Sequence, residues 1–360
     1  LYPNQPKANL DRESLEALIE FARRNKPFNI HWFGGEPLIA WDDVIVEAVK
    51  IAESKGLRVP EDLKFGMTTN AVLLDEKKIE YIKKYQIGLL ISIDGPEEKH
   101  DRHRVYPDGR GSWKDVWRAL NLVRKHYISV PELRWTLSPE NLDGFADDVK
   151  WFVEQGLINL AIDPVYECKW YEEDYRKFRE EMIKLRGYLI RWLRYGIPVY
   201  LMPVRKGIEP IMQLRRTWRY RCGLAQGNLG MDINGDLYPC HRFVATHDKR
   251  LVLGNIKDLL DGEGYKKFEE KRLALNRYWW QTPPFNAEDM SMCDKCVFKP
   301  ACMGGCLAVN YDLYGDFHTL PTTFCRIHQI LAEVFLPLHY LMIAENNQTY
   351  IRTYLRMFRP

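Results

Sequence analysis

Seven of the chain's eight cysteines lie in one stretch, and their pattern constrains the fold more than any other feature of the sequence. Four of them follow the spacing C-x2-C-x5-C-x3-C, two precede that run, and one follows it. Gly235 separates the two upstream cysteines in the spacing C-x12-G-x4-C. Thiolates are soft ligands that select zinc, copper(I) or iron–sulfur clusters. The seven cysteines are Cys222, Cys240, Cys293, Cys296, Cys302, Cys306 and Cys325.

Three interpretations of these cysteines compete. Disulfide frameworks belong to small secreted domains, whereas this chain has 360 residues and no recognisable signal peptide. Structural zinc is the more serious alternative, because paired C-x2-C units are its usual signature. However, the x2–x5–x3 run matches no common zinc spacing. Cysteine runs of this kind are the normal ligands of iron–sulfur clusters, and this is the interpretation we favour.

The whole arrangement resembles the SPASM domain of radical S-adenosylmethionine (SAM) enzymes, which carries two auxiliary four-iron (4Fe–4S) clusters. The resemblance covers residues 222–325 and uses every cysteine in that range. The ligands that it implies are Cys222, Cys240 and Cys306 for an inner cluster, and Cys293, Cys296, Cys302 and Cys325 for an outer one.

The inner set has three cysteines, whereas a four-iron cluster has four ligand positions. Either the fourth position is open to substrate, or Cys168, the one cysteine outside the pattern, fills it. Cys168 is followed by Lys169-Trp170-Tyr171 and a helical pattern, which is typical of a packed junction. We expect the open site.

Ahead of the cysteines, strand-like runs alternate with amphipathic helical patterns, which indicates βαβ units and a parallel sheet. Asp11 is a candidate N-cap for the first helix. Because a helix comes first, we expect a sixth strand before Leu1 and an open, TIM-like (β/α)6 barrel. The expected strands are 28–33, 64–68, 88–93, 133–137 and 157–162, and the expected helices are 11–25, 41–51, 75–85, 112–126, 143–155 and 171–195.

A length of 360 residues suggests two domains, or one barrel with an appendage. We expect the barrel in residues 1–200, the SPASM domain in 201–330 and C-terminal helices in 331–360. The 46% hydrophobic content suits a full core. A formal net charge of +3 gives no argument for nucleic acid or a membrane surface, so we expect neither as a partner. The cytoplasm is the expected compartment.

Polar motifs follow the predicted strands, where function gathers in such barrels. The first is Gly34-Gly35-Glu36-Pro37, which taken alone is more often a tight turn. Two glycines let a backbone approach a ligand closely, and a carboxylate beside them can hold an amine. In this context the motif resembles the radical SAM segment whose backbone and glutamate bind the amino group of SAM. The resemblance therefore gives this role to Gly34, Gly35 and Glu36.

Four further residues are candidates for SAM contacts by the same resemblance. Ser92 and Asp94 match a Ser-x-Asp-Gly segment that lies against the ribose and methionine parts of SAM, although Asp-Gly-Pro is also strong turn chemistry. Arg134 stands in an otherwise apolar strand, where the family often has an arginine that meets the SAM carboxylate. Asn70 matches the family's Thr-Asn pattern.

The sequence departs from the family in one respect. Radical SAM enzymes hold their SAM-binding cluster by C-x3-C-x2-C in the loop after the first strand, and this chain contains no such motif. That loop would fall just ahead of Leu1, where we expect it, and a protein that has lost the chemistry is the alternative. The retained Gly-Gly-Glu-Pro and ligand cysteines favour the first explanation.

The resemblance implies an oxidoreductase that cleaves SAM to a 5′-deoxyadenosyl radical, which abstracts hydrogen from a bound peptide or protein. A ribosomally made peptide, cross-linked by a thioether or carbon–carbon bond, is the leading substrate. A formylglycine-forming, anaerobic sulfatase-maturing enzyme is the alternative, but those enzymes carry an aspartate where this chain has His241. A non-catalytic, metal-bound scaffold is a third hypothesis. An external electron donor such as flavodoxin or ferredoxin is also implied, whereas no catalytic residue can be assigned.

Overall fold

The computed structural model describes residues 9–126, 131–214, 223–225, 227–246, 248–281, 286–287, 293–294, 296 and 305–355. The chain forms two compact units, each assembled from separate stretches of sequence. The first unit comprises Leu1–Leu90, Lys125–Ile128 and Cys222–Pro283. The second comprises Ile91–Arg124, Ser129–Arg221 and Pro284–Pro360.

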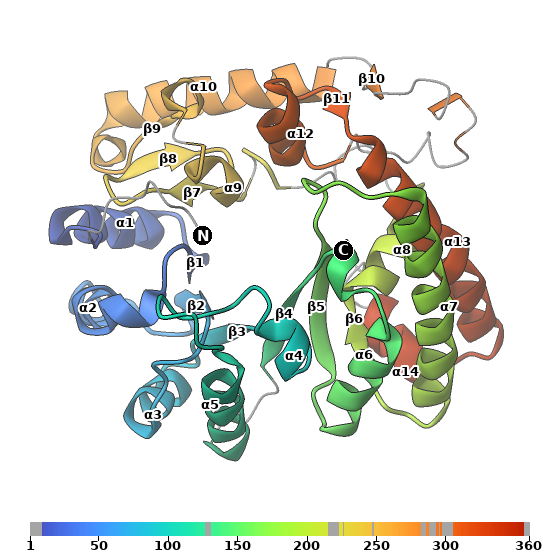
Figure 1. Cartoon of the computed structure of the whole chain (residues 1–360). Helices are drawn as coiled ribbons and strands as arrows, with labels where there is room; N and C mark the ends of the chain where they lie inside the picture. The colour runs from blue at the N-terminus through green and yellow to red at the C-terminus, as the bar shows by residue number, and fades with distance from the viewer. Residues whose placement is uncertain are drawn as a thin grey trace. The chain divides into compact units, whose positions relative to one another are not determined.

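The main sheet is six-stranded, and the strands follow one another in sheet order as they do in sequence (Figure 1). The first two strands pair in parallel, and so do the neighbours among the last three strands. Parallel neighbours require crossover connections, which helices supply here. The predicted α/β class is therefore confirmed. The strands are β1 (Phe28–Trp32), β2 (Leu63–Thr69), β3 (Gly88–Ser92), β4 (Glu132–Leu137), β5 (Asn159–Pro164) and β6 (Tyr200–Leu201).

The sheet contains one strand that the sequence analysis did not predict. This strand, β6, is two residues long and follows α7. The strand expected ahead of Leu1 stays a prediction. Such a short strand has no readable alternation of apolar and polar residues. It is held partly by a side chain, because the Tyr354 hydroxyl accepts from the Leu201 amide at 3.0 Å and donates to the Val199 carbonyl at 2.9 Å. Sequence periodicity cannot reveal a strand of this kind.

In the first unit, α1 (Arg12–Arg24) begins at Asp11, whose carboxylate accepts from the Ser14 amide at 2.8 Å, as the predicted N-cap should. The helix buries one apolar face and packs beside α2. The region that follows β6 adds a small antiparallel sheet and a long helix to this unit. The other elements are the 3-10 helix Pro37–Ala40, the π-helix Trp41–Val46 leading into α2 (Glu47–Ser54), α3 (Glu76–Lys84), β7 (Gly230–Met231), β8 (Asp236–Tyr238), α9 (His241–Val244), the 3-10 helix Lys249–Leu251, β9 (Gly254–Asn255), the 3-10 helix Asp258–Leu260 and α10 (Gly262–Gln281).

In the second unit, apolar residues of β4 alternate with polar ones. Trp135 is 1% exposed and packs on Phe145 and Phe152, with ring centroids 5.1 and 5.5 Å apart. Arg134 consequently lies on the opposite face of the sheet. The helices and short strands of this unit are α4 (Glu97–His100), α5 (Trp113–His126), the 3-10 helix Pro139–Asn141, α6 (Phe145–Glu154), α7 (Glu172–Arg194), α8 (Met202–Leu214), β10 (Asn286–Ala287), α12 (Leu307–Tyr314), β11 (Thr319–Leu320), α13 (Thr322–Ala344), α14 (Gln348–Tyr350) and the π-helix Ile351–Leu355.

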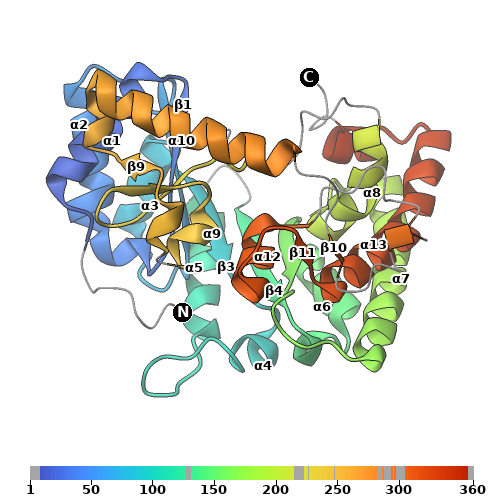
Figure 2. The same ribbon diagram turned by 90° about the horizontal axis from the view of Figure 1, so that it is seen from above.

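Helix α13 packs against α7 and α8 (Figure 2). The approach to α8 is close, because a Cβ added to Gly207 would lie 2.5 Å from the Leu331 carbonyl oxygen. Among the described residues, α13 is the one helix long and apolar enough to cross a membrane, with a mean hydropathy of 1.4 over a window that is 50% buried. A packed core helix has these same properties.

The compact units do not follow the expected boundaries at residues 200 and 330. Residues 222–283 group with the first strands, whereas 284–360 group with 91–124 and 129–221. The boundary at 330 also falls inside α13, which continues to Ala344. The expected division into a barrel, a cysteine-rich domain and C-terminal helices stays a prediction.

Candidate active site

The loop after β1 contains the predicted Gly-Gly-Glu-Pro motif. Gly34 and Gly35 have backbone φ values of +92° and +58°, which residues other than glycine rarely adopt. A Cβ added to either glycine would meet nothing within 4 Å. Conformation, rather than crowding by the protein, therefore requires glycine here, and the space beside the backbone is open to a ligand.

The carboxylate of Glu36 is fixed by three donors. Its Oε1 accepts from the Leu38 amide at 3.0 Å and from the Thr69 hydroxyl at 2.6 Å. Its Oε2 accepts from the Asn70 amide at 2.8 Å. Thr69 is 2% exposed, so this hydroxyl donor is fixed in the core. Each carboxylate oxygen can accept more than one hydrogen bond, so Glu36 can still bind an ammonium group.

Asn70 takes part through its backbone as well as its side chain. Its side-chain oxygen accepts from the Val72 amide at 3.0 Å, while the Thr69 hydroxyl accepts from the Ala71 amide at 2.9 Å. These bonds stabilise the turn after β2, which in turn holds Glu36. Thr69 is thus a supporting residue that sequence reasoning did not single out, although it lies next to a predicted site residue.

One contact in the first unit joins two motifs that are far apart in sequence. Phe33, directly before Gly34, meets the ring of His241 edge-on at a centroid distance of 5.2 Å. His241 follows Cys240, and its Nδ1 lies 3.5 Å from the Cys240 sulfur. The Gly-Gly-Glu-Pro loop and the turn that carries Cys240 are therefore neighbours, which no spacing in the sequence indicates.

In the second unit, Ser92 and Asp94 are both buried, with exposures of 8% and 4%. The Asp94 carboxylate accepts from the Thr136 amide at 2.7 Å and pairs with Arg104. The Asp94 amide donates to Nδ1 of His100 at 3.2 Å. Burial, followed by the charge of Arg104, lowers the pKa of His100 to about 4, which keeps its ring neutral. Asp94 thus anchors its own turn, and its contact with a cofactor stays a prediction.

Arg134, in the first half of β4, belongs to a polar network that includes Asp163 near the carboxyl end of β5. It pairs with Asp163, which also pairs with Lys206 of α8. Lys206 donates to the Tyr166 hydroxyl at 3.0 Å, and that hydroxyl lies 3.1 Å from Nε2 of His328. Burial, followed by the charge of Lys206, lowers the pKa of His328 to about 3. Sequence analysis found Arg134 but none of the residues that hold it.

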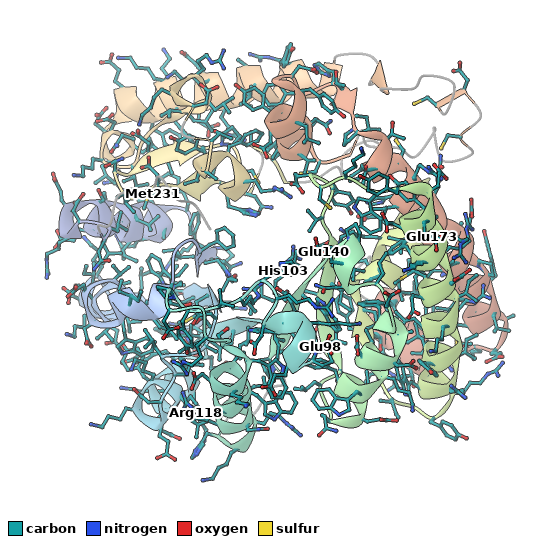
Figure 3. All side chains as sticks on the ribbon, viewed as in Figure 1. Glu98, His103, Arg118, Glu140, Glu173 and Met231 are labelled. Atoms are coloured by element: carbon teal, nitrogen blue, oxygen red, sulfur yellow. The ribbon has the colours of Figure 1, made fainter. Side chains whose placement is uncertain are left out.

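Two loops that follow neighbouring strands are also tied together. His103, after α4, lies 3.1 Å from the carboxylate of Glu140, which follows β4 (Figure 3). Arg102 bridges the same loops, because it donates to the Glu140 carbonyl at 2.9 Å and to the Glu98 carboxylate at 2.6 Å. These exposed contacts join the loop after α4 to the turn after β4.

The described cysteines are distributed over both units. Cys240 precedes α9 in the first unit, whereas Cys306 precedes α12 in the second. Cys222 and Cys302 lie outside the described residues. Within the part of the chain that the structure describes, no three His, Cys, Asp or Glu residues are grouped closely enough to hold a metal ion. One member of each predicted ligand set therefore lies outside the described residues, and both sets stay predictions.

Three of the four predicted outer ligands, Cys293, Cys296 and Cys325, are among the described residues, and they belong to the second unit. The Cys296 amide donates to the Cys293 carbonyl at 3.2 Å, which closes a turn between these two cysteines. The Gln329 side-chain amide donates to the Cys296 sulfur at 3.6 Å. Gln329 lies one helical turn beyond Cys325 on α13, so these contacts bring Cys296 close to the helix face that carries Cys325.

Cys168 is half-buried beyond the end of β5. Its thiol donates to the Val165 carbonyl at 3.6 Å, and the Trp170 indole donates to the same oxygen at 2.8 Å. Burial raises the pKa of the Cys168 thiol, which favours its protonated form. This is the packed junction expected from the sequence, and the open inner cluster stays a prediction.

Comparison with known proteins identifies relatives of this chain. Residues 3–152 match the model of the Radical SAM superfamily. The radical SAM cyclopropyl synthase TigE of Paramaledivibacter caminithermalis is 24% identical over 331 residues, which cover 88% of this chain but 62% of that protein. The chain therefore spans less than two thirds of the length of this relative.

The serine-type anaerobic sulfatase-maturating enzyme of Bacteroides thetaiotaomicron is 23% identical over 330 residues, covering 85% of this chain and 76% of that enzyme. Among solved structures, native anSMEcpe with bound AdoMet superposes with a TM-score of 0.75 at 19% identity, covering 95% of this chain and 91% of that one. Residues 3–152 therefore belong to the Radical SAM superfamily, and the chain shares the fold of anSMEcpe.

Proposed function

We propose that this chain is a radical SAM oxidoreductase that modifies a peptide or protein. The observation that carries the proposal is the prepared carboxylate of Glu36, oriented by the Thr69 hydroxyl and two backbone amides next to two glycines in the left-handed conformation. An ammonium group with a fixed carboxylate partner gains a charge-assisted hydrogen bond. The amino group of SAM is such a group.

The remaining SAM contacts are carried over from the resemblance to the family. The backbones of Gly34 and Gly35 would approach the ligand, Arg134 would meet its carboxylate, and Ser92 would lie against its ribose and methionine parts. Asn70 supports Glu36 through its amide, while Asp94 holds the turn in place. When bound with its cluster, SAM supplies the 5′-deoxyadenosyl radical that removes hydrogen from the substrate.

Two auxiliary four-iron clusters in a SPASM-type region belong to the proposal. Cys222, Cys240 and Cys306 would hold the inner cluster, with one position open to substrate. The other cysteines of the pattern, Cys293, Cys296, Cys302 and Cys325, would hold the outer one. The donor chemistry fits, because thiolates are the normal ligands of such clusters. The fit is supported by the turn between Cys293 and Cys296, and by Cys325 in the first turn of α13.

Peptide cross-linking is the substrate chemistry that we favour. The chain matches a cyclopropyl synthase as well as sulfatase-maturating enzymes, and one anSMEcpe structure contains a Kp18Cys peptide. His241 stands where sulfatase-maturating enzymes carry an aspartate, which argues against formylglycine formation here. A ribosomally made peptide joined by a thioether or carbon–carbon bond is therefore the first candidate, and formylglycine formation is the second. We place the enzyme in the cytoplasm, where an external electron donor such as flavodoxin or ferredoxin would reduce its clusters.

The test is an anaerobic assay of reconstituted full-length protein with SAM, a reductant and the short peptide encoded beside its gene. We expect 5′-deoxyadenosine and loss of hydrogen from the peptide by mass spectrometry. A sulfatase peptide serves as the alternative substrate, and formylglycine on it would support the second candidate. If iron-loaded protein forms no 5′-deoxyadenosine, the result would contradict the enzyme proposal and favour the hypothesis of a non-catalytic scaffold.

A further inference from the structure

The first turns of α13 are anchored to α7 independently of any metal. The Tyr175 hydroxyl donates to the Thr323 hydroxyl at 3.2 Å. Arg326 donates to the Glu172 carboxylate at 2.7 Å and lies over the Tyr175 ring, 3.9 Å from its centroid. Figure 2 shows α7 and α13 side by side. Side chains on both sides of Cys325 therefore hold this part of α13 against α7.

A second aromatic contact fixes the opposite side of this turn. Phe324 packs on Tyr166 and His328, with ring centroids 4.8 and 4.0 Å apart. Tyr166 in turn accepts from Lys206 of α8. Residues on both sides of Cys325 thus contact the end of β5 or α7, so the position of Cys325 and of the next helical turn is set by the fold.

Gln329 follows Cys325 by four positions, which places both side chains on one face of α13. Its amide nitrogen donates to the sulfur of Cys296 at 3.6 Å, within the longer range of hydrogen bonds to sulfur. Cys296 closes a turn with Cys293. One helix face therefore presents a thiol and an amide donor to the loop that carries two more predicted ligands.

We propose that Gln329 is a positioning residue for the outer auxiliary cluster, which orients Cys296 and raises the cluster's reduction potential. The inference rests on the proposed function, since it assumes that this cluster exists. An N–H group that donates to a ligand sulfur stabilises the more negative, reduced state, so it favours uptake of an electron. Because the donor sits on an anchored helix, it is in place before the electron arrives.

The experiment compares reduction potentials in full-length protein with reconstituted clusters. The Cys293→Ala variant removes a predicted ligand of the outer cluster. The electron paramagnetic resonance signal that this variant loses is therefore assigned to the outer cluster. We expect Gln329→Leu, which removes the donor, to shift the midpoint of that signal to a more negative potential. Gln329→Glu keeps the shape but replaces the donor by an acceptor, so its shift should be at least as large. Gln155→Leu, at the C-terminal end of α6, is the matched control and should cause no shift.

The outcomes separate the inference from the proposed function. Wild-type protein that binds no outer cluster, by iron and sulfide analysis, would contradict the proposed function. An outer cluster whose potential is unchanged in both Gln329 variants would overturn this inference alone. If Gln329→Leu binds too little iron for a redox titration, the midpoint potential is measured in Gln329→Glu alone. An unchanged midpoint potential in that variant would also overturn the inference about Gln329.

Discussion

Glu36 in the first unit and Cys296 in the second are both held by hydrogen bonds from other segments, but to very different extents. Glu36 accepts three bonds of 2.6–3.0 Å, including one from the buried Thr69. Cys296 accepts one bond at 3.6 Å from Gln329. Neutral donors can fix one carboxylate, whereas several thiolates repel one another until a metal neutralises them.

The difference predicts two modes of assembly. The Glu36 site should form with the protein, because its donors belong to strand ends and to its own turn. The loops that carry the outer cysteines should gain much of their order from the metal, since metal binding contributes folding free energy where no preformed site exists. The following tests address this contrast.

Removal of iron should have the largest effect. We expect amide hydrogen exchange to become about tenfold faster, or more, in α12 and around Cys293 and Cys296, a change of at least about 1.4 kcal/mol in local opening. Strands β1 and β2 should exchange at unchanged rates. Mass spectrometry of the cluster-loaded and iron-free forms checks this, and equal protection of α12 in the two forms would remove the contrast.

Substitution of Glu36 tests the preformed site. Glu36→Gln should weaken SAM binding by about 10–100-fold, because the ammonium loses a charged partner worth about 1.5–3 kcal/mol. Asp42→Asn, an exposed carboxylate in the same segment, is the matched control and should leave the affinity unchanged. Isothermal titration calorimetry on anaerobic protein makes the measurement. Equal affinity in the Glu36 variant would reduce Gly34-Gly35-Glu36-Pro37 to a structural turn.

The same contrast explains what could be predicted from the sequence. Asp11, the Gly-Gly-Glu-Pro turn and the cysteine spacing are local signals, and the structure agrees with the first two. Thr69 has no special spacing, and its importance appears only where β2 ends beside Glu36. The Asp163 carboxylate that holds Arg134 also comes from a different strand. Contacts between segments distant in sequence leave no periodic trace.

Thr69 provides a smaller test of the Glu36 site. Thr69→Val removes the hydroxyl that donates to Glu36 and accepts from Ala71, and should weaken SAM binding by about fivefold, or about 1 kcal/mol. Thr69→Ser retains the hydroxyl and should bind nearly as well as the wild type. The same calorimetric titration applies. A serine variant as weak as the valine variant would show that the lost methyl group, rather than the hydrogen bond, matters.

The smallest expected effect concerns the Ser92–Asp94 turn, which tests whether preformed geometry extends into the second unit. His100 is fully buried, accepts from the Asp94 amide at 3.2 Å, and contacts the Ser112 hydroxyl at 3.0 Å. Its pKa is lowered to about 4, mainly by burial. In the unfolded chain the imidazole should titrate near its ordinary pKa of about 6.5.

Because the unfolded state binds a proton more readily, stability from the neutral His100 is present at high pH and is lost as pH falls below about 6.5. Between about pH 7 and pH 6 the loss should be about 0.7 kcal/mol. His100→Asn retains an acceptor without titrating, so its stability should depend less on pH by that amount. Urea unfolding of both proteins at each pH makes the comparison. Parallel pH profiles would mean that His100 is not held neutral, and that the turn around Asp94 is less preformed than the turn around Glu36.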